Sequence, residues 1–317
     1  MKIAVLNECF LSDDHLKRLQ TLGEVVVYGD TKTEDHAIER LKGVNVAIWD
    51  GFICAPTAKI LETTDQLKLI VLPHTGYFMA DLEAAQKKGI KVANAPGFSK
   101  QAVAELVIGL IFAVNRKISL MDRDMRDNPF ESDPGSLEHQ NRYWGFDIKG
   151  RTMGIIGLGR IGSTVATLAL GLGMKVIANN RSPKTMDGVE MVSKEELLKR
   201  SDVVSINVTS GADTKNLISQ KELDMMESHA ILINVDQGPM IDTEALYLAL
   251  QERKIGGAGL DQVAGLAKDH PLLKLDNVVF TGHAGSSTNE SFRVNLPELV
   301  VSAIEGFVSG NPKNFVN

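Results

Sequence analysis

The chain has 317 residues, of which 44% are hydrophobic and 23% are charged, as in an ordinary globular protein. This length exceeds the size at which a single hydrophobic core usually keeps growing, so we expect two domains. With 34 basic and 40 acidic side chains the formal net charge is −6, which argues against a nucleic-acid-binding surface.

The N-terminus, Met-Lys-Ile-Ala-Val-Leu, reads directly as a first strand. It lacks the charged start and long apolar middle of a signal peptide. No later apolar run approaches the length needed to span a bilayer. The two cysteines, Cys9 and Cys54, show no spacing typical of a disulfide framework or a zinc site. We therefore expect a cytoplasmic protein with no membrane partner and no metal.

The first hundred residues alternate between short apolar runs and helical patterns. The predicted strands are Lys2 to Leu6, Glu24 to Tyr28, Val44 to Trp49, Leu67 to Leu72 and Ile90 to Ala93. The predicted helices between them lie near Asp14 to Leu22, Thr33 to Leu41, Thr57 to Thr63 and Asp81 to Lys88. Alternation of this kind predicts a parallel sheet covered by helices.

The loop Pro73 to Tyr77 follows the fourth predicted strand, at the edge where open α/β sheets place their ligands. No glycine-rich phosphate turn follows the first strand. This half of the chain is therefore predicted to be a substrate domain, and the turn-rich Asn94 to Gly97 is a candidate hinge at its end.

A long helix is predicted from about Lys100 to Ser119, capped by Ser99 and apolar on more than one side, which suggests burial at a domain or subunit contact. The next segment, Arg123 to Phe146, is charged and contains two prolines. We interpret it as an arm whose aromatic residues Tyr143 and Trp144 are exposed and form dimer contacts, with local packing as the alternative. A homodimer is therefore expected.

The stretch Thr152 to Gly162 carries the pattern Gly157-x-Gly159-x-x-Gly162. An apolar run precedes it and an apolar, small-residue pattern follows, so the glycines fall between a buried strand and a helix, as a dinucleotide fingerprint requires. Gly157 allows a tight turn, Gly159 lets the backbone approach a pyrophosphate, and Gly162 lets the helix pack on the strand. The motif alone is weak evidence, but a second strand, Lys175 to Ala178, follows at the expected distance.

The rest of the chain continues the alternation. Further strands are predicted at Val203 to Val208, Ala230 to Val235, Ala258 to Asp261 and Val278 to Thr281, and further helices near Lys194 to Arg200, Lys221 to Met226 and Thr243 to Glu252. The last helical pattern, Ser291 to Ser309, is predicted to return to the first domain. We therefore predict a substrate domain of residues 1–98 plus 289–317 and an NAD(P)-binding domain of residues 99–288.

These motifs and others resemble, in one order and over essentially the whole chain, those of the D-isomer-specific 2-hydroxyacid dehydrogenases, the relatives of phosphoglycerate dehydrogenase. The resemblance implies an α/β fold with two doubly wound parallel-sheet domains, in which a Rossmann cofactor domain is inserted in a flavodoxin-like substrate domain. The matching pieces are Thr75 to Tyr77, Val103 to Glu105, Gly154 to Gly162, Ser201 to Ser205, Thr214 to Ile218, Ile233 and Asn234, Gly238, Asp242, Glu244 to Leu246, Gly257 to Asp261, His270 to Leu272, Asn277 and Val278, and His283 to Thr288.

The family implies hydride transfer between a nicotinamide cofactor and the C2 carbon of a 2-oxo or 2-hydroxy acid. In such enzymes an arginine holds the carboxylate, a histidine exchanges the proton, and a glutamate orients the histidine. The histidine matches His283, for which a structural role at a strand end is the alternative.

The arginine and glutamate positions depart from the family pattern. Relatives read Asn-x-x-Arg-Gly where this chain reads Asn234-Val235-Asp236-Gln237-Gly238. At Gln237 a bidentate, charge-assisted clamp therefore becomes at most a neutral hydrogen bond. Where relatives carry the glutamate, five residues past Asp261, this chain has Leu266.

Two functions remain open at this point. The first is an enzyme that reduces a carbonyl compound other than a standard 2-oxo acid, with His283 as proton donor and Gln237 binding an oxygen. The second is a pseudoenzyme that retains a nucleotide pocket and acts as a binding or sensing protein.

The residues after the second strand of the cofactor domain bear on the choice of nucleotide. NAD-preferring relatives end this strand in an aspartate, which repels a 2′-phosphate. Here Asn180 stands at the acidic position, and Arg181 and Ser182 can bind a phosphate, as in NADP-using members. NADP is therefore the preferred cofactor, and NAD, with Arg181 merely exposed in a turn, is the alternative.

The resemblance also supplies further candidate contacts to the cofactor and to a small-molecule substrate. For the cofactor they are Gly157, Gly159, Arg160, Ile161 and Gly162, together with Asp261, which faces the nicotinamide amide. Asn207, Val208, Thr209 and Thr214 line the adenosine side. For the substrate they are His74, Thr75, Gly76 and Tyr77. His74 can supply a charge or proton that the lost arginine does not, or be solvated, and Tyr77 can be a pocket wall or a packing residue.

Overall fold

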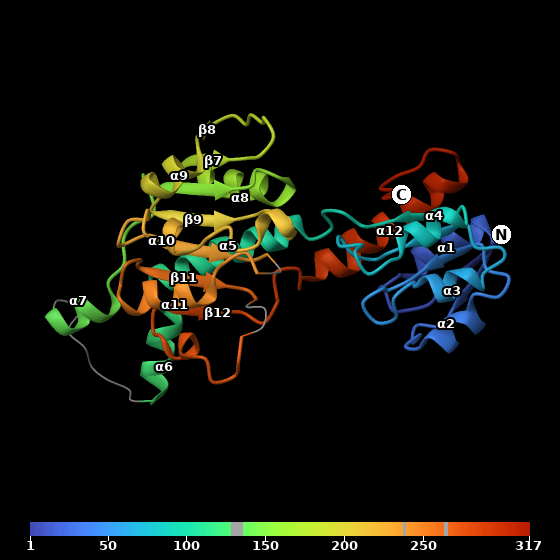
Figure 1. The fold of residues 1–317 in the computed structure, drawn as a ribbon, viewed down its shortest axis with the longest axis horizontal. Coiled ribbons are helices and arrows are strands. Elements are labelled where there is room, and N and C mark those ends of the chain that lie inside the picture. The colour runs from blue at the N-terminus through green and yellow to red at the C-terminus, as the bar shows by residue number, and fades with distance from the viewer. Residues whose placement is uncertain (128–135, 237–238, 263–265) are drawn as a thin grey trace. The chain divides into compact units, whose positions relative to one another are not determined.

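The computed structural model describes residues 1–127, 136–236, 239–262 and 266–317. It divides into two compact units, which we call unit 1 and unit 2 (Figure 1). Unit 1 consists of Met1–Ser99 and Ser287–Asn317, and unit 2 of Lys100–Ser286. Unit 1 is therefore built from both ends of the sequence.

Unit 1 contains a five-stranded parallel sheet in the order β2-β1-β3-β4-β5. Its strands are β1 (Lys2–Val5), β2 (Glu24–Val27), β3 (Val46–Ile48), β4 (Leu69–Val71) and β5 (Lys91–Ala93). The helices between them are α1 (Asp13–Leu22), α2 (Glu34–Arg40), α3 (Ala58–Glu62) and α4 (Leu82–Lys87). This strand order is the flavodoxin-like one, so the predicted class of this domain is confirmed.

The C-terminal part of the chain completes unit 1. A π-helical turn, η3 (Glu290–Asn295), leads into α12 (Leu296–Val308), which packs against α1 and β4 (Figure 1). Val300 and Ile304 of α12 are fully buried in the same core cluster as Ile3 of β1. Across the α1–α12 contact, Arg18 forms ion pairs with Glu298 at 2.6 Å and Glu305 at 2.9 Å.

Unit 2 contains a seven-stranded parallel sheet in the order β12-β11-β10-β9-β6-β7-β8. Its strands are β6 (Thr152–Ile156), β7 (Lys175–Asn179), β8 (Val189–Met191), β9 (Val203–Ile206), β10 (Ile231–Asn234), β11 (Gly257–Leu260) and β12 (Val278–Phe280). Its α-helices are α5 (Lys100–Asn115), α6 (Ile118–Asp127), α7 (Leu137–Tyr143), α8 (Arg160–Gly171), α9 (Lys194–Arg200), α10 (Gln220–Leu223) and α11 (Thr243–Gln251). Two short 3₁₀ turns, η1 (Ala212–Thr214) and η2 (Pro271–Lys274), lie in its loops.

Helices cover both faces of this sheet. Successive side chains of a strand point to opposite faces, so neighbouring residues of β6 contact different helices. On one face Met153 and Ile155 of β6 share a core cluster with residues of α5 and α8. On the other face Ile156 shares a cluster with residues of α9, α10 and α11. Both units are thus doubly wound α/β folds, as the sequence predicted. In unit 2 the strand order reverses between β6 and β9.

Three features of unit 2 differ from the sequence prediction. The helix expected to reach Ser119 ends at Asn115, because Lys117 has a left-handed backbone with φ 55° and α6 begins after it. Tyr143 was wrongly expected to be exposed: it is 8% exposed, and its hydroxyl donates to Asp124 at 2.8 Å, while Trp144 is 59% exposed. The short edge strand β8 was not predicted at all.

No helix in the described part of the chain combines the length and the apolar composition that crossing a bilayer requires.

Candidate functional site

The carboxyl edge of the unit 2 sheet gathers most of the candidate residues. All seven strands are parallel, so the loops that leave them line one edge at intervals of about 4.8 Å. In a doubly wound sheet this edge, at the point where the strand order reverses, is where ligands bind. In sheet order from β12 to β7 the loops carry His283, Asp261, Asp236, Asn207 with Val208, the fingerprint glycines, and Asn180.

The three fingerprint glycines differ in what surrounds them. Gly157 has φ 94°, and a Cβ atom there would overlap the carbonyl of Asn207 and lie 2.6 Å from Cγ1 of Val208. A Cβ at Gly162 would overlap the carbonyl of Gly157. At Gly159, the N-cap of α8, a Cβ would meet nothing within 4 Å. The first and third glycines are therefore needed by the fold, and the second leaves open space at the helix N-terminus.

This open space fits the pyrophosphate of a dinucleotide. The N-cap Gly159 has no side chain to bond the first N–H groups of α8, so these donors and the helix dipole face the space in front of the helix. Arg160 is exposed in the first turn of the helix, while Ile161 packs partly against the core. A bound nicotinamide dinucleotide would be held here by backbone groups, with Arg160 able to add a charge.

The residues after β7 are tied to the fingerprint loop. The Oδ1 atom of Asn180 accepts a hydrogen bond from the backbone N–H of Leu158 at 3.1 Å, and its Nδ2 donates to the carbonyl of Ser182 at 2.7 Å. Arg181 lies 3.4 Å from Asp213, and both side chains are more than four-fifths exposed. Arg181 is therefore available to a solvent-facing anion such as a 2′-phosphate.

Lys184 is a residue of this region that the sequence analysis missed. Its ammonium donates to the carbonyl of Leu158 and lies 3.4 Å from Oγ of Ser163, in the first turn of α8. A cation is thus placed at the phosphate-binding turn. The sequence offers only a weak signal for this role, namely that Lys184 follows Asn180 by four residues.

The loop after β9 is held by its own side chains. The hydroxyl of Thr214 donates to the carbonyl of Thr209 at 3.1 Å and accepts from the N–H of Gly211 at 2.9 Å. Asn207 donates through Nδ2 to the hydroxyl of Ser205 at 2.9 Å. Thr209 and Thr214 therefore shape the loop in the first place, and Val208 packs against Gly157.

Three polar acceptors at this edge are buried without a hydrogen-bond donor among the described residues. They are Oδ1 of Asn207, Oδ2 of Asp236 and Oε1 of Gln262, which follow the neighbouring strands β9, β10 and β11. Most buried acceptors in folded proteins have a partner, so a row of three such atoms needs an explanation. A ligand that supplies donors would provide one.

Asp236 is the charged member of this row. Burial raises the pKa of its carboxyl to about 7, and one hydrogen bond from the backbone of Val208 offsets only part of that rise. Its backbone N–H donates to Oδ1 of Asn234 at 3.3 Å. The sequence analysis quoted Asp236 only as a neighbour of Gln237, although an acid beside a lost arginine is a signal in itself.

Asp261 organises the loop that carries His283. It is 1% exposed, and its two carboxylate oxygens accept from the hydroxyl of Thr281 at 2.5 Å and from the N–H groups of Ala284 at 2.8 Å and Gly285 at 2.9 Å. Its carbonyl accepts from the N–H of His283 at 2.7 Å, and His283 has a left-handed φ of 58°. The exposed His283 is thus presented by a fully bonded turn.

The structure describes Leu266 but not Gln237, the two residues that depart from the family pattern. Gln237 lies outside the described residues, as does Gly238. Leu266 is partly buried and packs against the core cluster shared by α9, α10 and α11. The apolar side chain at the glutamate position is therefore part of the core packing.

The candidate substrate loop of unit 1 is braced at several points. Nε2 of His74 lies 2.9 Å from Oδ1 of Asp50, and its ring packs edge-on against Phe52. His74 is therefore a paired histidine and not a solvated one. The carbonyl of Thr75 accepts from Asn94 at 2.7 Å, Gly76 follows it, and Tyr77 is half-exposed beyond.

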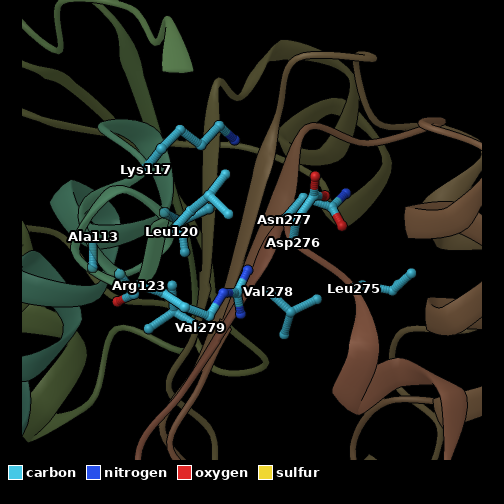
Figure 2. Close-up of a pocket in the computed structure, with 11 residues that line it drawn as sticks. Ala113, Lys117, Leu120, Arg123, Leu275, Asp276, Asn277, Val278 and Val279 are labelled. Atoms are coloured by element: carbon cyan, nitrogen blue, oxygen red, sulfur yellow. The ribbon is translucent and has the colours of Figure 1, made fainter. Parts of the chain in front are cut away.

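A cavity of about 30 Å³ lies elsewhere in unit 2, between the α5–α6 turn and the amino end of β12 (Figure 2). Lys117, Leu120 and Arg123 line one side, and Asp276 and Asn277 line the other. Because it lies at the opposite end of the strand from His283, this cavity is separate from the candidate site. The described residues contain no group of acidic, His and Cys side chains placed to hold a metal ion.

Known proteins resemble this chain over its whole length. Residues 108–285 match the NAD binding domain of the D-isomer specific 2-hydroxyacid dehydrogenases. A glyoxylate reductase of Thermococcus litoralis is 36% identical over 97% of this chain and 94% of its own, and a glycerate dehydrogenase of Methylorubrum extorquens is 36% identical over 91% and 90%. The solved structure of an acyclic imino acid reductase in complex with NADPH and D-arginine is 34% identical, covers all of both chains and has a TM-score of 0.86.

The matched domain contains the fingerprint, Asp261 and His283, so the similarity includes the edge where these residues gather. The relatives with full-length similarity are named reductases and dehydrogenases. The chain therefore belongs to the D-isomer specific 2-hydroxyacid dehydrogenases, a family of NAD(P)-dependent oxidoreductases.

Proposed function

We propose that this protein transfers a hydride between a nicotinamide cofactor and a small carbonyl or hydroxy compound, with His283 as the proton donor or acceptor. Pyruvate, glyoxylate and 3-phosphohydroxypyruvate are expected to be poor substrates, because Gln237 carries no charge to hold a carboxylate. A carbonyl compound whose neighbouring group is neutral fits this site better. The observation that carries the proposal is Gln237 at the arginine position beside a complete nucleotide turn.

We further propose that NADP(H) is bound in preference to NAD(H). Asn180 offers no negative charge to repel a 2′-phosphate, and its oxygen is already bonded to Leu158. Arg181 is exposed beside it, and Lys184 brings a second cation to the same turn. Separate dissociation constants for NADPH and NADH test this, and tighter binding of NADH would contradict it.

A C=N compound is a second candidate substrate. Asp236 places an ionisable carboxyl next to the neutral Gln237, so the site can carry negative charge beside the position where the family pattern has an arginine. A protonated imine is a cation whose carbon can accept a hydride while the π electrons move to nitrogen and give an amine. The full-length similarity to an imino acid reductase supports including this class.

The first experiment is an NADPH-oxidation screen against neutral ketones, aldehydes, 2-oxo acids, and 2-oxo acids mixed with ammonia or methylamine. Turnover of glyoxylate or pyruvate at ordinary enzyme rates, about 1 to 1,000 per second, would contradict the proposed selectivity. Amine-dependent turnover would favour the imine candidate. Thermal stabilisation by nucleotide without turnover of any compound would favour a nucleotide-binding pseudoenzyme.

The double variant Gln237→Arg, Leu266→Glu tests the role of the two departures. We expect it to gain 2-oxo acid reduction relative to the wild type, because it restores both the carboxylate clamp and the acid beside the histidine loop. The single variant Gln237→Lys is the control, since it restores charge without the bidentate geometry.

A homodimer is also proposed. Trp144 is 59% exposed at the end of α7, where a subunit contact would bury it. Sedimentation analysis of the wild type and Trp144→Ala tests this. A monomeric wild type would contradict it.

A further inference from the structure

Asp236 lies on the side of the sheet edge that the strand order assigns to the nicotinamide. A dinucleotide in a doubly wound fold spans the point where the strand order reverses, with one mononucleotide half on each side. That point is between β6 and β9. The fingerprint and Asn180 follow β6 and β7, so the adenosine half belongs there and the nicotinamide half belongs over the ends of β9, β10 and β11.

By strand order the three unpartnered acceptors all lie on the nicotinamide side, including Asn207, which the resemblance assigns to the adenosine side. Oδ1 of Asn207, Oδ2 of Asp236 and Oε1 of Gln262 are buried at the ends of three adjacent strands. A buried acceptor without a donor destabilises a protein until a ligand supplies a donor or a positive charge. The row therefore fits a ligand group that combines N–H donors with positive charge.

Asp236 is the acceptor in this row that responds to charge. Its carboxyl receives one hydrogen bond, from the backbone of Val208, and no charged side chain of the described residues shifts its pKa, which burial raises to about 7. The carboxyl is thus divided between neutral and ionised forms near neutral pH. A positive charge placed beside it favours the ionised form.

We propose that Asp236 is a charge-sensing residue of the cofactor site, whose carboxylate binds the oxidised, cationic nicotinamide in preference to the neutral, reduced one. The inference rests on the cofactor binding proposed above. The oxidised ring carries a positive charge that the reduced ring lacks, and both carry an amide that donates hydrogen bonds. Asn207 and Gln262 can accept from the amide in either state, whereas only Asp236 distinguishes the two states.

Other charged groups lie at this edge, and their contribution to a pH dependence of nucleotide binding has to be distinguished from that of Asp236. They are Asp261 after β11, His283 after β12 and Arg160 after β6. Asp261 is held by three donors of the loop after β12, and a guanidinium stays charged at all relevant pH values. Imidazole side chains can titrate near neutral pH, so His283 needs a control variant.

The test is calorimetric titration of the protein with NADP⁺ and with NADPH between pH 6 and pH 8, in buffers of different ionisation enthalpy. Binding of NADP⁺ should release protons near pH 7, and binding of NADPH should not. If the oxidised ring lowers the pKa of Asp236 by about one unit, the ratio of NADP⁺ to NADPH affinity should rise on the order of tenfold over this range.

The isosteric variant Asp236→Asn should bind both nucleotides with a ratio that no longer depends on pH, while His283→Gln should keep the pH dependence. Should Asp236→Asn fail to fold, the proton release of the wild type and of His283→Gln decides the matter. Equal proton release with both nucleotides, or a pH dependence that survives in Asp236→Asn, would overturn the inference. If neither nucleotide binds, the proposed cofactor use fails with it, whereas failure of the inference alone leaves binding intact.

Discussion

The two halves of the carboxyl edge of the unit 2 sheet differ in how their polar groups are hydrogen-bonded. After β6 and β7, Asn180 and Lys184 bond to the fingerprint loop, and the first N–H groups of α8 face open space. After β9, β10 and β11, three buried acceptors have no donor in the part of the chain that the structure describes. The fingerprint turn is thus held by side chains of the same chain and offers donors to a ligand, whereas the neighbouring half offers acceptors. A chain of this kind can keep its cofactor turn while the chemistry beside it changes.

The largest expected effect separates Gly162 from Gly159 in the fingerprint turn. Gly162→Ala should lower the free energy of unfolding by about 4 kcal/mol, because its Cβ overlaps the carbonyl of Gly157. Gly159→Ala should leave the Tm almost unchanged but weaken nucleotide binding, since its Cβ occupies the open space before α8. Thermal unfolding with and without NADPH measures both. A stable Gly162→Ala protein would show that the turn is looser than described.

The second prediction concerns the stability of a variant of Asp236, in the half of the edge that carries the unpartnered acceptors. The pKa of Asp236 is about 7 in the folded chain against an ordinary 3.8, so its contribution to stability is full below pH 3.8 and is lost as the pH rises through 7. Asp236→Asn should therefore stabilise the nucleotide-free protein at pH 8 by at most about 4 kcal/mol, and have little effect near pH 4. Urea unfolding at both pH values checks the sign. Destabilisation at pH 8 would mean that the carboxylate has a partner.

Glu222 provides the matched opposite case, a buried acid with its donors in place. Although burial alone would raise its pKa, hydrogen bonds from Ser219 and Lys194 lower the pKa to about 2. Its stabilisation is present above pH 4.5 and is lost as the pH falls toward 2. Glu222→Gln should cost about 2 kcal/mol at pH 7, a value reduced for the partly exposed Lys194. The same unfolding series measures it, and a cost that persists at pH 2 would point to packing instead.

The smallest expected effect concerns the cations after β7. Lys184→Met should weaken NADPH binding by about tenfold, equivalent to about 1.4 kcal/mol, because it removes a cation from the phosphate turn. Arg181→Met should weaken NADPH binding more than NADH binding, since Arg181 would contact only the 2′-phosphate. Fluorescence titration with both nucleotides distinguishes the two roles. Equal losses for both nucleotides in Arg181→Met would remove it from 2′-phosphate recognition.

Much of the fold could be predicted, because most strands of the two sheets are buried and read as short apolar runs between helices. The fingerprint was equally accessible, since the function of Gly157 and Gly162 is steric and local. The edge strand β8 was missed because Val189 to Met191 is exposed and lacks an apolar run. The helix break at Lys117 was missed because a left-handed backbone at a lysine has no sequence signal.

The candidate site was less predictable wherever it depends on contacts between distant segments. His74 pairs with Asp50, which lies one strand earlier in the chain, and no local pattern links them. Asp261 was assigned to the cofactor from resemblance, yet its oxygens bond the loop of His283. The row of unpartnered acceptors depends on sheet order, which brings residues 207, 236 and 262 to adjacent strands.

The discontinuity of unit 1 constrains the order in which the two units can fold during synthesis. The core around Ile3 is closed by Val300 and Ile304 of α12, which are synthesised after unit 2. The whole of unit 2 has emerged by then, and domains fold as units while translation proceeds. The apolar residues of β1 that pack with α12 are therefore left uncovered by that helix until unit 2 has been synthesised.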